Sequence, residues 1–347
     1  MRILAALLTS LPLTIPLMAQ TAGYTAQRLQ DHGIEVVRLT DTAHHAEVAI
    51  VPTVGNMAYE FKINGKNILY FPFDNVAEFR DRPVFCGVPF LAPWANRIAG
   101  MNYWANGKQY LLNAELSSLR KDANGLPVHG VVNFSKYWEL VEVKADEYGA
   151  RVTSRLQFWK YPELMAQWPF AHEYEMTYRL VDGALEVATV VRNKSLEPMP
   201  ISVGFHPYLD LPGVERDEWT AHLAARKSVS MDSQSVATGE FPALESRDVP
   251  LRAKALDYGF IDLIRDGAGH ATFSVEGGGK SVSVVYGPEY TVAIAYAPAG
   301  KKFICFEPMT AVTNGVNLAH QGKYSGLQTV APNGEWRESF WIKASGI

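Results

Sequence analysis

Short stretches in which apolar and polar residues alternate constrain the fold of this chain more than any other feature. Residues 174–180 and 185–191 both alternate in this way, and Asp182-Gly183 lies between them. A period of two is that of a strand with one buried face, and Asp-Gly between two such runs is a strong hairpin signal. The pattern therefore predicts a β-hairpin over this segment.

Similar alternation recurs along the chain, at residues 152–158, 281–286 and 291–296, with Gly-containing turn sequences at Asn64-Gly65, Asn106-Gly107 and Gly277-Gly278-Gly279. Helical periodicity is scarce, and we expect no more than one turn near residues 74–79. Many short strands separated by Gly and Pro favour an all-β fold, a large antiparallel β-sandwich. No linker, charge block or internal repeat divides residues 20–347, so we expect them to form a single domain.

The N-terminus has the pattern of a secretory signal peptide. Arg2 precedes an apolar run that extends to Leu17, and the small residue Ala19 follows. Pro12 and Pro16 interrupt the run, which is also too short to span a bilayer comfortably. We expect residues 1–19 to be the signal peptide of an exported protein, periplasmic or secreted; the alternative is an uncleaved N-terminal tether.

The charge of the chain argues against polyanionic partners. The formal net charge is −4, and the sequence contains no run of Lys and Arg. Neither nucleic acid nor an anionic lipid surface is therefore an expected partner, and no later segment is apolar enough to cross a membrane. Cys86 and Cys305 are the only two cysteines, and they could form one disulfide or remain two buried thiols.

Two polar residues in apolar surroundings form a candidate acid–base pair. Glu307 follows the apolar run 303–306 and precedes Pro308, which we expect to end regular strand pairing. A glutamate placed there is partly desolvated, which raises its pKa towards neutral pH. His206 lies between Phe205 and Pro207, and the loss of water lowers the pKa of its imidazole. The other interpretation of His206 is a hydrogen-bonded core histidine.

Three further residues could bind a ligand. The planar guanidinium of Arg97 can donate two hydrogen bonds to neighbouring oxygens, although a structural salt bridge is equally consistent with its sequence. His129 precedes Gly130, which allows backbone or ligand to come close to the imidazole. Asp257 is acidic among apolar neighbours, and a turn residue is the simpler interpretation. On a strand, Cys305 would share a face with Glu307.

Several other chemistries lack their sequence signals. The chain has no phosphate-binding Gly-rich loop ahead of a helix and no Gly-x-Ser-x-Gly nucleophile motif. The adjacent pair His44-His45 has no further ligand at close spacing, and metal sites usually need three or four converging ligands. We therefore expect no metal site.

Read in order, several phrases resemble those of the aldose 1-epimerase (galactose mutarotase) family. The matching phrases begin at Pro93-Trp94-Ala95-Asn96-Arg97-Ile98 and Tyr110-Leu111-Leu112-Asn113, and continue through Val128-His129-Gly130, Gly204-Phe205-His206-Pro207-Tyr208, Asp257-Tyr258-Gly259-Phe260 and Cys305-Phe306-Glu307-Pro308-Met309-Thr310, with Asn317 after them. The resemblance covers almost the whole chain after residue 34.

The resemblance implies a β-sandwich with its active site in a cleft on a concave sheet face, and neither a metal nor an organic cofactor. It implies that Glu307 is the catalytic base and His206 the acid in the ring opening and reclosure of a free hexose such as glucose or galactose. Arg97, His129, Asp257 and the adjacent Asn96 would bind this monosaccharide. An acid and a base acting together predict a bell-shaped pH dependence.

The sequence departs from the galactose-type pattern at residues 166–172, which we expect to line the substrate rim. Hexose 6-phosphates are disfavoured, because Asn96-Arg97 follows the free-sugar pattern and an exported enzyme meets little sugar phosphate. Two other functions stay open at this point. One is a carbohydrate-binding protein without turnover, and the other is a hydrolase or lyase that uses Asp257 and Glu307 as paired carboxylates.

Overall fold

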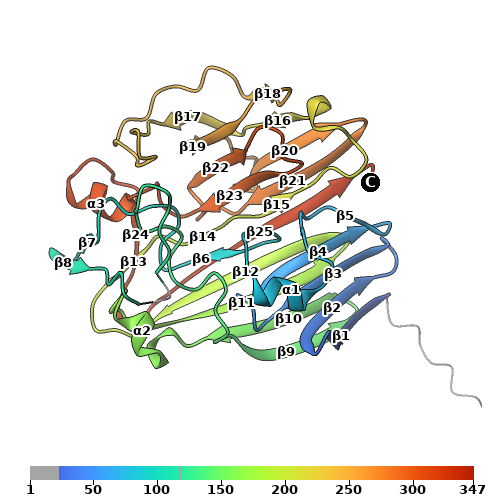
Figure 1. Ribbon diagram of the computed structural model, residues 1–347, viewed down its shortest axis with the longest axis horizontal. Coiled ribbons are helices and arrows are strands. Elements are labelled where there is room, and N and C mark those ends of the chain that lie inside the picture. Colours follow the sequence, from blue (N-terminus) through green and yellow to red (C-terminus); the bar gives the residue numbers. More distant parts are fainter. Residues whose placement is uncertain (1–22, 117–118) are drawn as a thin grey trace, which may run out of the picture.

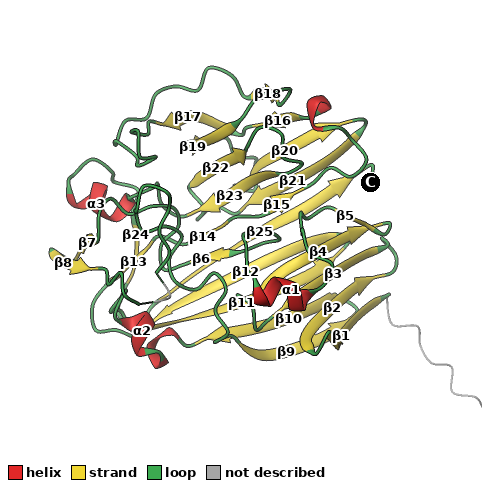
Figure 2. Cartoon of the chain, in the orientation of Figure 1, coloured by secondary structure: helices red, strands yellow, loops and turns green. Residues whose placement is uncertain are grey.

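The computed structural model describes residues 23–116 and 119–347, so the predicted signal peptide 1–19 lies outside the described residues. Three large β-sheets dominate the regular secondary structure of this part of the chain (Figures 1 and 2). The helices that it contains are short, and none of them is long and apolar enough to span a bilayer. The prediction of an all-β antiparallel sandwich is therefore confirmed.

The largest sheet has nine strands and forms one layer of the sandwich. In spatial order its strands are β18 (Asp248–Pro250), β16 (Thr220–His222), β20 (Ala271–Gly277), β21 (Lys280–Tyr286), β25 (Glu335–Ser345), β12 (Ala184–Asn193), β11 (His172–Val181), β10 (Gly149–Leu156) and β9 (Glu139–Asp146). The predicted hairpin is β11 and β12, which pair antiparallel from His172 opposite Asn193 to Val181 opposite Ala184.

A five-stranded sheet and a seven-stranded sheet are the other two large sheets (Figure 1). The five-stranded sheet is β1 (Tyr24–Asp31), β2 (Ile34–Asp41), β3 (Ala46–Val51), β4 (Met57–Ile63) and β5 (Lys66–Asn67). The seven-stranded sheet is β17 (Ala225–Val229), β19 (Leu256–Leu263), β22 (Val292–Ala297), β23 (Ile304–Met309), β14 (Gly204–Phe205) and β6 (Phe90–Leu91), with β15 (Tyr208–Leu209) also paired to β23.

The remaining elements are small. Two further sheets have two strands each, the hairpin of β7 (Asn102–Ala105) and β8 (Lys108–Leu111), and the pair of β13 (Met199–Ile201) and β24 (Gln328–Val330). The helices are α1 (Val76–Asp81), α2 (Pro162–Met165) and α3 (Gly315–His320), with single 3-10 turns η1 (Phe158–Lys160) and η2 (Arg216–Glu218). Helix α1 is the turn that the sequence predicts near residues 74–79, and Asn75 caps it by accepting a hydrogen bond from the Glu78 amide.

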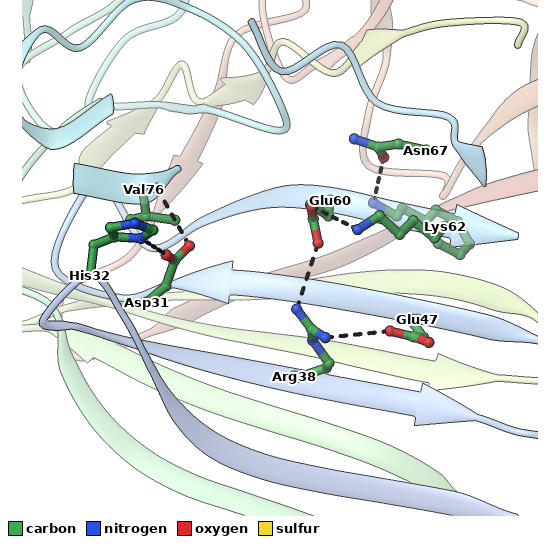
Figure 3. Close-up of polar contacts among 9 residues, drawn as sticks. Asp31, His32, Arg38, Glu47, Glu60, Lys62, Asn67 and Val76 are labelled. Atoms are coloured by element: carbon green, nitrogen blue, oxygen red, sulfur yellow. Dashed lines mark hydrogen bonds and ion pairs between the residues drawn. The ribbon is translucent and has the colours of Figure 1, made fainter. Parts of the chain in front are cut away.

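Buried side chains of all three large sheets form one continuous apolar cluster that includes Val48 of β3, Phe260 of β19 and Phe340 of β25. The opposite face of the five-stranded sheet is mixed, with a second apolar cluster that packs Val36 and Tyr59 against Phe79 of α1, and charged pairs beside it. There Arg38 lies near both Glu47 and Glu60, and Lys62 also contacts Glu60 (Figure 3). The five-stranded sheet is therefore covered on both faces, by the main core and by α1.

The prediction that Pro308 ends strand pairing is wrong. Strand β23 continues through Pro308, which lies opposite Ala293 of β22, to Met309 opposite Val292. Proline lacks only its amide hydrogen, and its carbonyl oxygen still accepts. Strand pairing on both sides of Glu307 gives the carboxyl group a rigid base.

The cysteines remain free. Cys86 and Cys305 are both buried and form no disulfide. Burial raises the pKa of the Cys86 thiol to about 12 and that of the Cys305 thiol well above its usual value, so neither is a reactive thiolate near neutral pH. The alternative of two buried thiols is the correct one.

Candidate active site

Strand β23 presents Glu307 on the face of the seven-stranded sheet that is turned away from the main core. Ile304 and Phe306 point into that core, whereas Cys305 belongs to a separate cluster with Tyr208 and Phe303. Because side chains alternate along a strand, Glu307 shares the face of Cys305, as the sequence predicts. The Glu307 side chain is nevertheless only 2% exposed.

His206 lies between β14 and β15, the two short strands that pair with β23. This position brings its Nε2 atom to 3.2 Å from Glu307 Oε1. The imidazole stacks on Tyr208 at a ring distance of 4.6 Å, and the Phe85 ring lies 6.1 Å from it. The two residues proposed as acid and base thus meet in space, which the sequence alone could not show.

Burial moves the pKa values of this pair in opposite directions. Burial raises the pKa of Glu307 well above its usual range, Asp257 raises it further, and the positive charge of Arg97 opposes the rise. Burial lowers the pKa of His206 to about 3. Over a wide pH range the pair therefore holds one proton between the carboxyl group and the imidazole. Glu307 Oε2 and His206 Nδ1 are buried without a hydrogen-bond partner, so both atoms are available to a ligand.

His129 and Asn96 come from two loops that bind each other through their backbones. The His129 amide donates to the Asn96 carbonyl at 2.9 Å, and the Asn96 amide donates to His129 Nδ1 at 3.3 Å. Since Nδ1 accepts, the neutral imidazole carries its hydrogen on Nε2. Burial and the charges of His206, Arg97 and Arg120 lower the pKa of His129 and keep it neutral. The Asn96 side chain donates to the sulfur of Met309. Asn96 therefore supports His129 through its backbone amide in this structure.

Arg97 is held in place by a carboxylate that the sequence analysis did not single out. Its Nε donates to Asp122 Oδ2 at 2.6 Å. The other carboxylate oxygen of Asp122 accepts from the amides of Asn124 and Leu126. Burial would raise the pKa of Asp122, but the hydrogen bonds from Arg97, Leu126 and Asn124 lower it below the usual value. This contact fixes one edge of the guanidinium and leaves its terminal nitrogens for other acceptors.

Asp257 lies on β19, two strands away from Glu307, and is exposed. It is opposite Tyr296 of β22, which in turn is opposite Cys305. Partial burial raises the pKa of Asp257, while the charge of Arg97 lowers it. Asp257 and Arg97 both influence the pKa of Glu307, and the strand register places Asp257 on the face of this sheet that carries Cys305 and Glu307.

The geometry overturns one expectation and adds three residues to the site. Residues 166–172 do not form the substrate rim, because Gln167, Trp168, Phe170 and His172 are buried in the core. Gln167 bonds the backbone of Asn113 through both its amide atoms. Phe85, Tyr296 and Asp122 were missed: the Asp122–Gly125 turn is visible in the sequence, but nothing there indicates its contact with Arg97.

A family model described as aldose 1-epimerase matches residues 36–343 of the chain, which is most of its length. The chain belongs to the aldose 1-epimerase family. It is therefore an enzyme of the isomerase class. The family resemblance predicted from the sequence motifs is confirmed.

Solved structures with the same fold include a galactose mutarotase-like protein from Clostridium acetobutylicum, at 24% identity and a TM-score of 0.83, covering 94% of this chain and 99% of that one. A protein from Synechocystis sp. PCC 6803 has 22% identity and a TM-score of 0.71, with 93% and 98% covered. Galactose 1-epimerase from Lactobacillus acidophilus NCFM has 13% identity and a TM-score of 0.71, with 93% and 99% covered. At these identities the likeness is one of fold.

Proposed function

We propose that this member of the family interconverts the α and β anomers of free hexoses such as glucose and galactose, with Glu307 and His206 as its acid–base pair. The observation that supports this is the buried contact of 3.2 Å between His206 Nε2 and Glu307 Oε1. Mutarotation requires a proton to leave the anomeric hydroxyl and another to reach the ring oxygen. Both oxygens are bonded to C1, so the groups that serve them must be neighbours.

The reaction then follows from one shared proton. Transfer of that proton from Glu307 to His206, favoured by the charge of Arg97, creates a carboxylate beside an imidazolium. Glu307 takes the proton of the anomeric hydroxyl, His206 gives its proton to the ring oxygen, the bond from C1 to the ring oxygen breaks and the aldehyde forms. Rotation about C1–C2 and the reverse transfers close the ring on the other face and restore the pair.

The surrounding residues are suited to bind the sugar hydroxyls. His129 offers an Nε2 hydrogen, the terminal nitrogens of Arg97 are donors, and Asp257 is an exposed acceptor. Aromatic rings at Phe85 and Tyr208 exclude water from His206. We assign these polar residues to substrate binding and place Asn96 behind His129.

The test is polarimetry on freshly dissolved α-D-glucose and α-D-galactose. The proposal expects the enzyme to speed the decay of rotation of at least one of them, and no acceleration of either would contradict it. A reducing-end assay on oligosaccharides separates this activity from hydrolysis by Asp257 and Glu307, because new reducing ends would favour the hydrolase.

We also propose that the chain is exported after removal of residues 1–19, on the basis of the charged and apolar pattern of this segment. Cell fractionation with N-terminal sequencing of the recovered protein tests this, and a cytoplasmic protein that retains Met1 or Arg2 would contradict it.

A further inference from the structure

A surface hollow of about 310 Å³ lies close to His129 and has two cationic side chains in its lining. Arg120, Asn133, Phe134, Lys136 and Tyr137 are among the residues around it. None of the residues to which the sequence analysis assigns a role lines this hollow. Its volume is at the lower end of the range typical of small-molecule sites.

Direct contacts join the hollow to the candidate active site. The Asn133 side chain donates to the His129 carbonyl at 2.8 Å. The Phe85 ring lies 5.2 Å from the His129 ring and 6.1 Å from the His206 ring. On the same ring, the Arg120 guanidinium carbon lies 5.0 Å from the centroid. The Arg120 guanidinium and the imidazole proposed as the acid therefore lie against the same aromatic ring.

The lining of this hollow carries two cations and one carboxylate, so a net positive charge remains among the described residues. Neither Arg120 nor Lys136 forms an ion pair with a carboxylate there, and Glu163, which also lines the hollow, accepts the Tyr137 hydroxyl hydrogen. Arg120 is instead held over the faces of Phe85 and Phe134. Stacked in this way, a guanidinium keeps its N–H groups in its own plane, where they can meet a planar acceptor.

We propose that Arg120, assisted by Lys136, binds an anionic substituent of the sugar, so that the preferred substrates are acidic aldoses such as hexuronic acids. This rests on the proposed epimerase function and specifies the substrate class of the same site. A carboxylate matches the fork of an arginine, and Arg120 lies against the Phe85 ring that is also close to His129 and His206. Burial lowers the pKa of Arg120, which indicates a partly dehydrated charge that an anion would stabilise.

The experiment compares kcat/KM for D-glucuronate and D-galacturonate with that for D-glucose, D-galactose and D-glucose 6-phosphate. Wild type is measured beside Arg120→Gln, Arg120→Lys and the control Arg28→Gln, which removes an exposed arginine charge from β1. The hexuronates should be the better substrates. Arg120→Gln should lower kcat/KM for them about tenfold or more and for the neutral hexoses about twofold at most, because a hydrogen bond to a charged group is lost. Arg120→Lys should restore part of the loss, and Arg28→Gln should change nothing.

The outcomes are distinct. Neutral hexoses that react as fast as hexuronates, with no selective loss in Arg120→Gln, would overturn the acidic-substrate inference and leave the epimerase proposal standing. A preference for glucose 6-phosphate alone would overturn the carboxylate assignment. If no sugar is accelerated, the proposed function fails and the inference fails with it. Thermal unfolding of each variant shows whether a lost rate reflects lost folding.

Discussion

At the residue scale, the chemistry depends on where one proton lies. An exposed glutamate and an exposed histidine would titrate near 4.3 and 6.5, about two pH units apart. Here burial raises the pKa of Glu307 and lowers that of His206 to about 3. The pair therefore holds a single proton over a wider pH range, at both the acid and the alkaline end, than a solvent-exposed pair would. This state could be foreseen only in part, because the sequence shows apolar neighbours but not their packing.

The pH dependence of kcat/KM follows from this state. Activity should fall on the acid side only as the pair gains a second proton, near the pKa of about 3 of His206. It should fall on the alkaline side where Glu307 loses its proton, well above the usual glutamate range. The predicted profile is a broad bell, level from above the pKa of His206 to beyond the usual glutamate range. The rates must first be corrected for buffer catalysis. A profile that rises near pH 4.3 and falls near pH 6.5 would show that the two groups titrate as exposed residues.

Asp122 should act as a positioning residue for Arg97. Asp122→Asn keeps an acceptor for the turn amides but removes the charge that Arg97 Nε contacts. We expect kcat/KM to fall about tenfold, in line with about 1.5 kcal/mol for a charge-assisted hydrogen bond. On an Arg97→Gln background the same change should cost little, because the two residues act together. Additive losses in this double-mutant cycle would contradict the assignment.

At the element scale, the sequence predicted the strands better than their ends. Alternation located β11, β12, β21 and β22, because a period of two depends only on which face is buried. The end of β23 was missed, because Pro308 can stay in a ladder when its absent amide is not needed. Close contacts between loops cannot be predicted from a sequence either, except where a glycine indicates that backbone comes close.

Gly130 is such a glycine, and it supports the loop that carries His129. It has a φ of +69°, and an added Cβ would lie 2.0 Å from the carbonyl oxygen of Ala92. Gly130→Ala should lower the free energy of unfolding by about 2–4 kcal/mol through strain and overlap. Gly65→Ala, at a φ of +77° with nothing within 4 Å of the Cβ, is the matched control and should cost only about 1 kcal/mol. Chemical denaturation measures the free energy of unfolding of both variants. Equal losses of stability would show that overlap with the Ala92 carbonyl does not matter.

At the scale of the whole molecule, the fold was predictable because alternation, turns and family phrases agree along the chain. The gathering of Arg97, His129, His206, Asp257 and Glu307 came from the resemblance rather than from spacing, since these residues lie on separate strands and loops. The hollow at Arg120 could not be predicted from the sequence, because it depends on how Phe85 and Phe134 pack.

Buried histidines should make the whole fold sensitive to acid. His172 is buried, bonds the Phe170 carbonyl through Nδ1 and has a pKa lowered by burial to about 4. The unfolded chain binds this proton below about pH 6.5 and the folded chain only near 4, so stability is lost as the pH falls through this window. Between pH 7 and 4.5, wild type should lose about 2–3 kcal/mol more than His172→Gln. Parallel urea denaturation at the two pH values checks this, and equal losses would contradict it.

The central claim is that the contact between Glu307 and His206 is the acid–base centre of an aldose 1-epimerase. Polarimetry of a freshly dissolved accepted sugar, with wild type beside Glu307→Gln and His206→Asn, tests it most directly. We predict that each variant loses at least 10²-fold in kcat/KM, as expected when a group that transfers a proton is removed. Both variants should keep their fold, as judged by thermal unfolding. A folded variant of either residue that retains the wild-type rate would contradict the account.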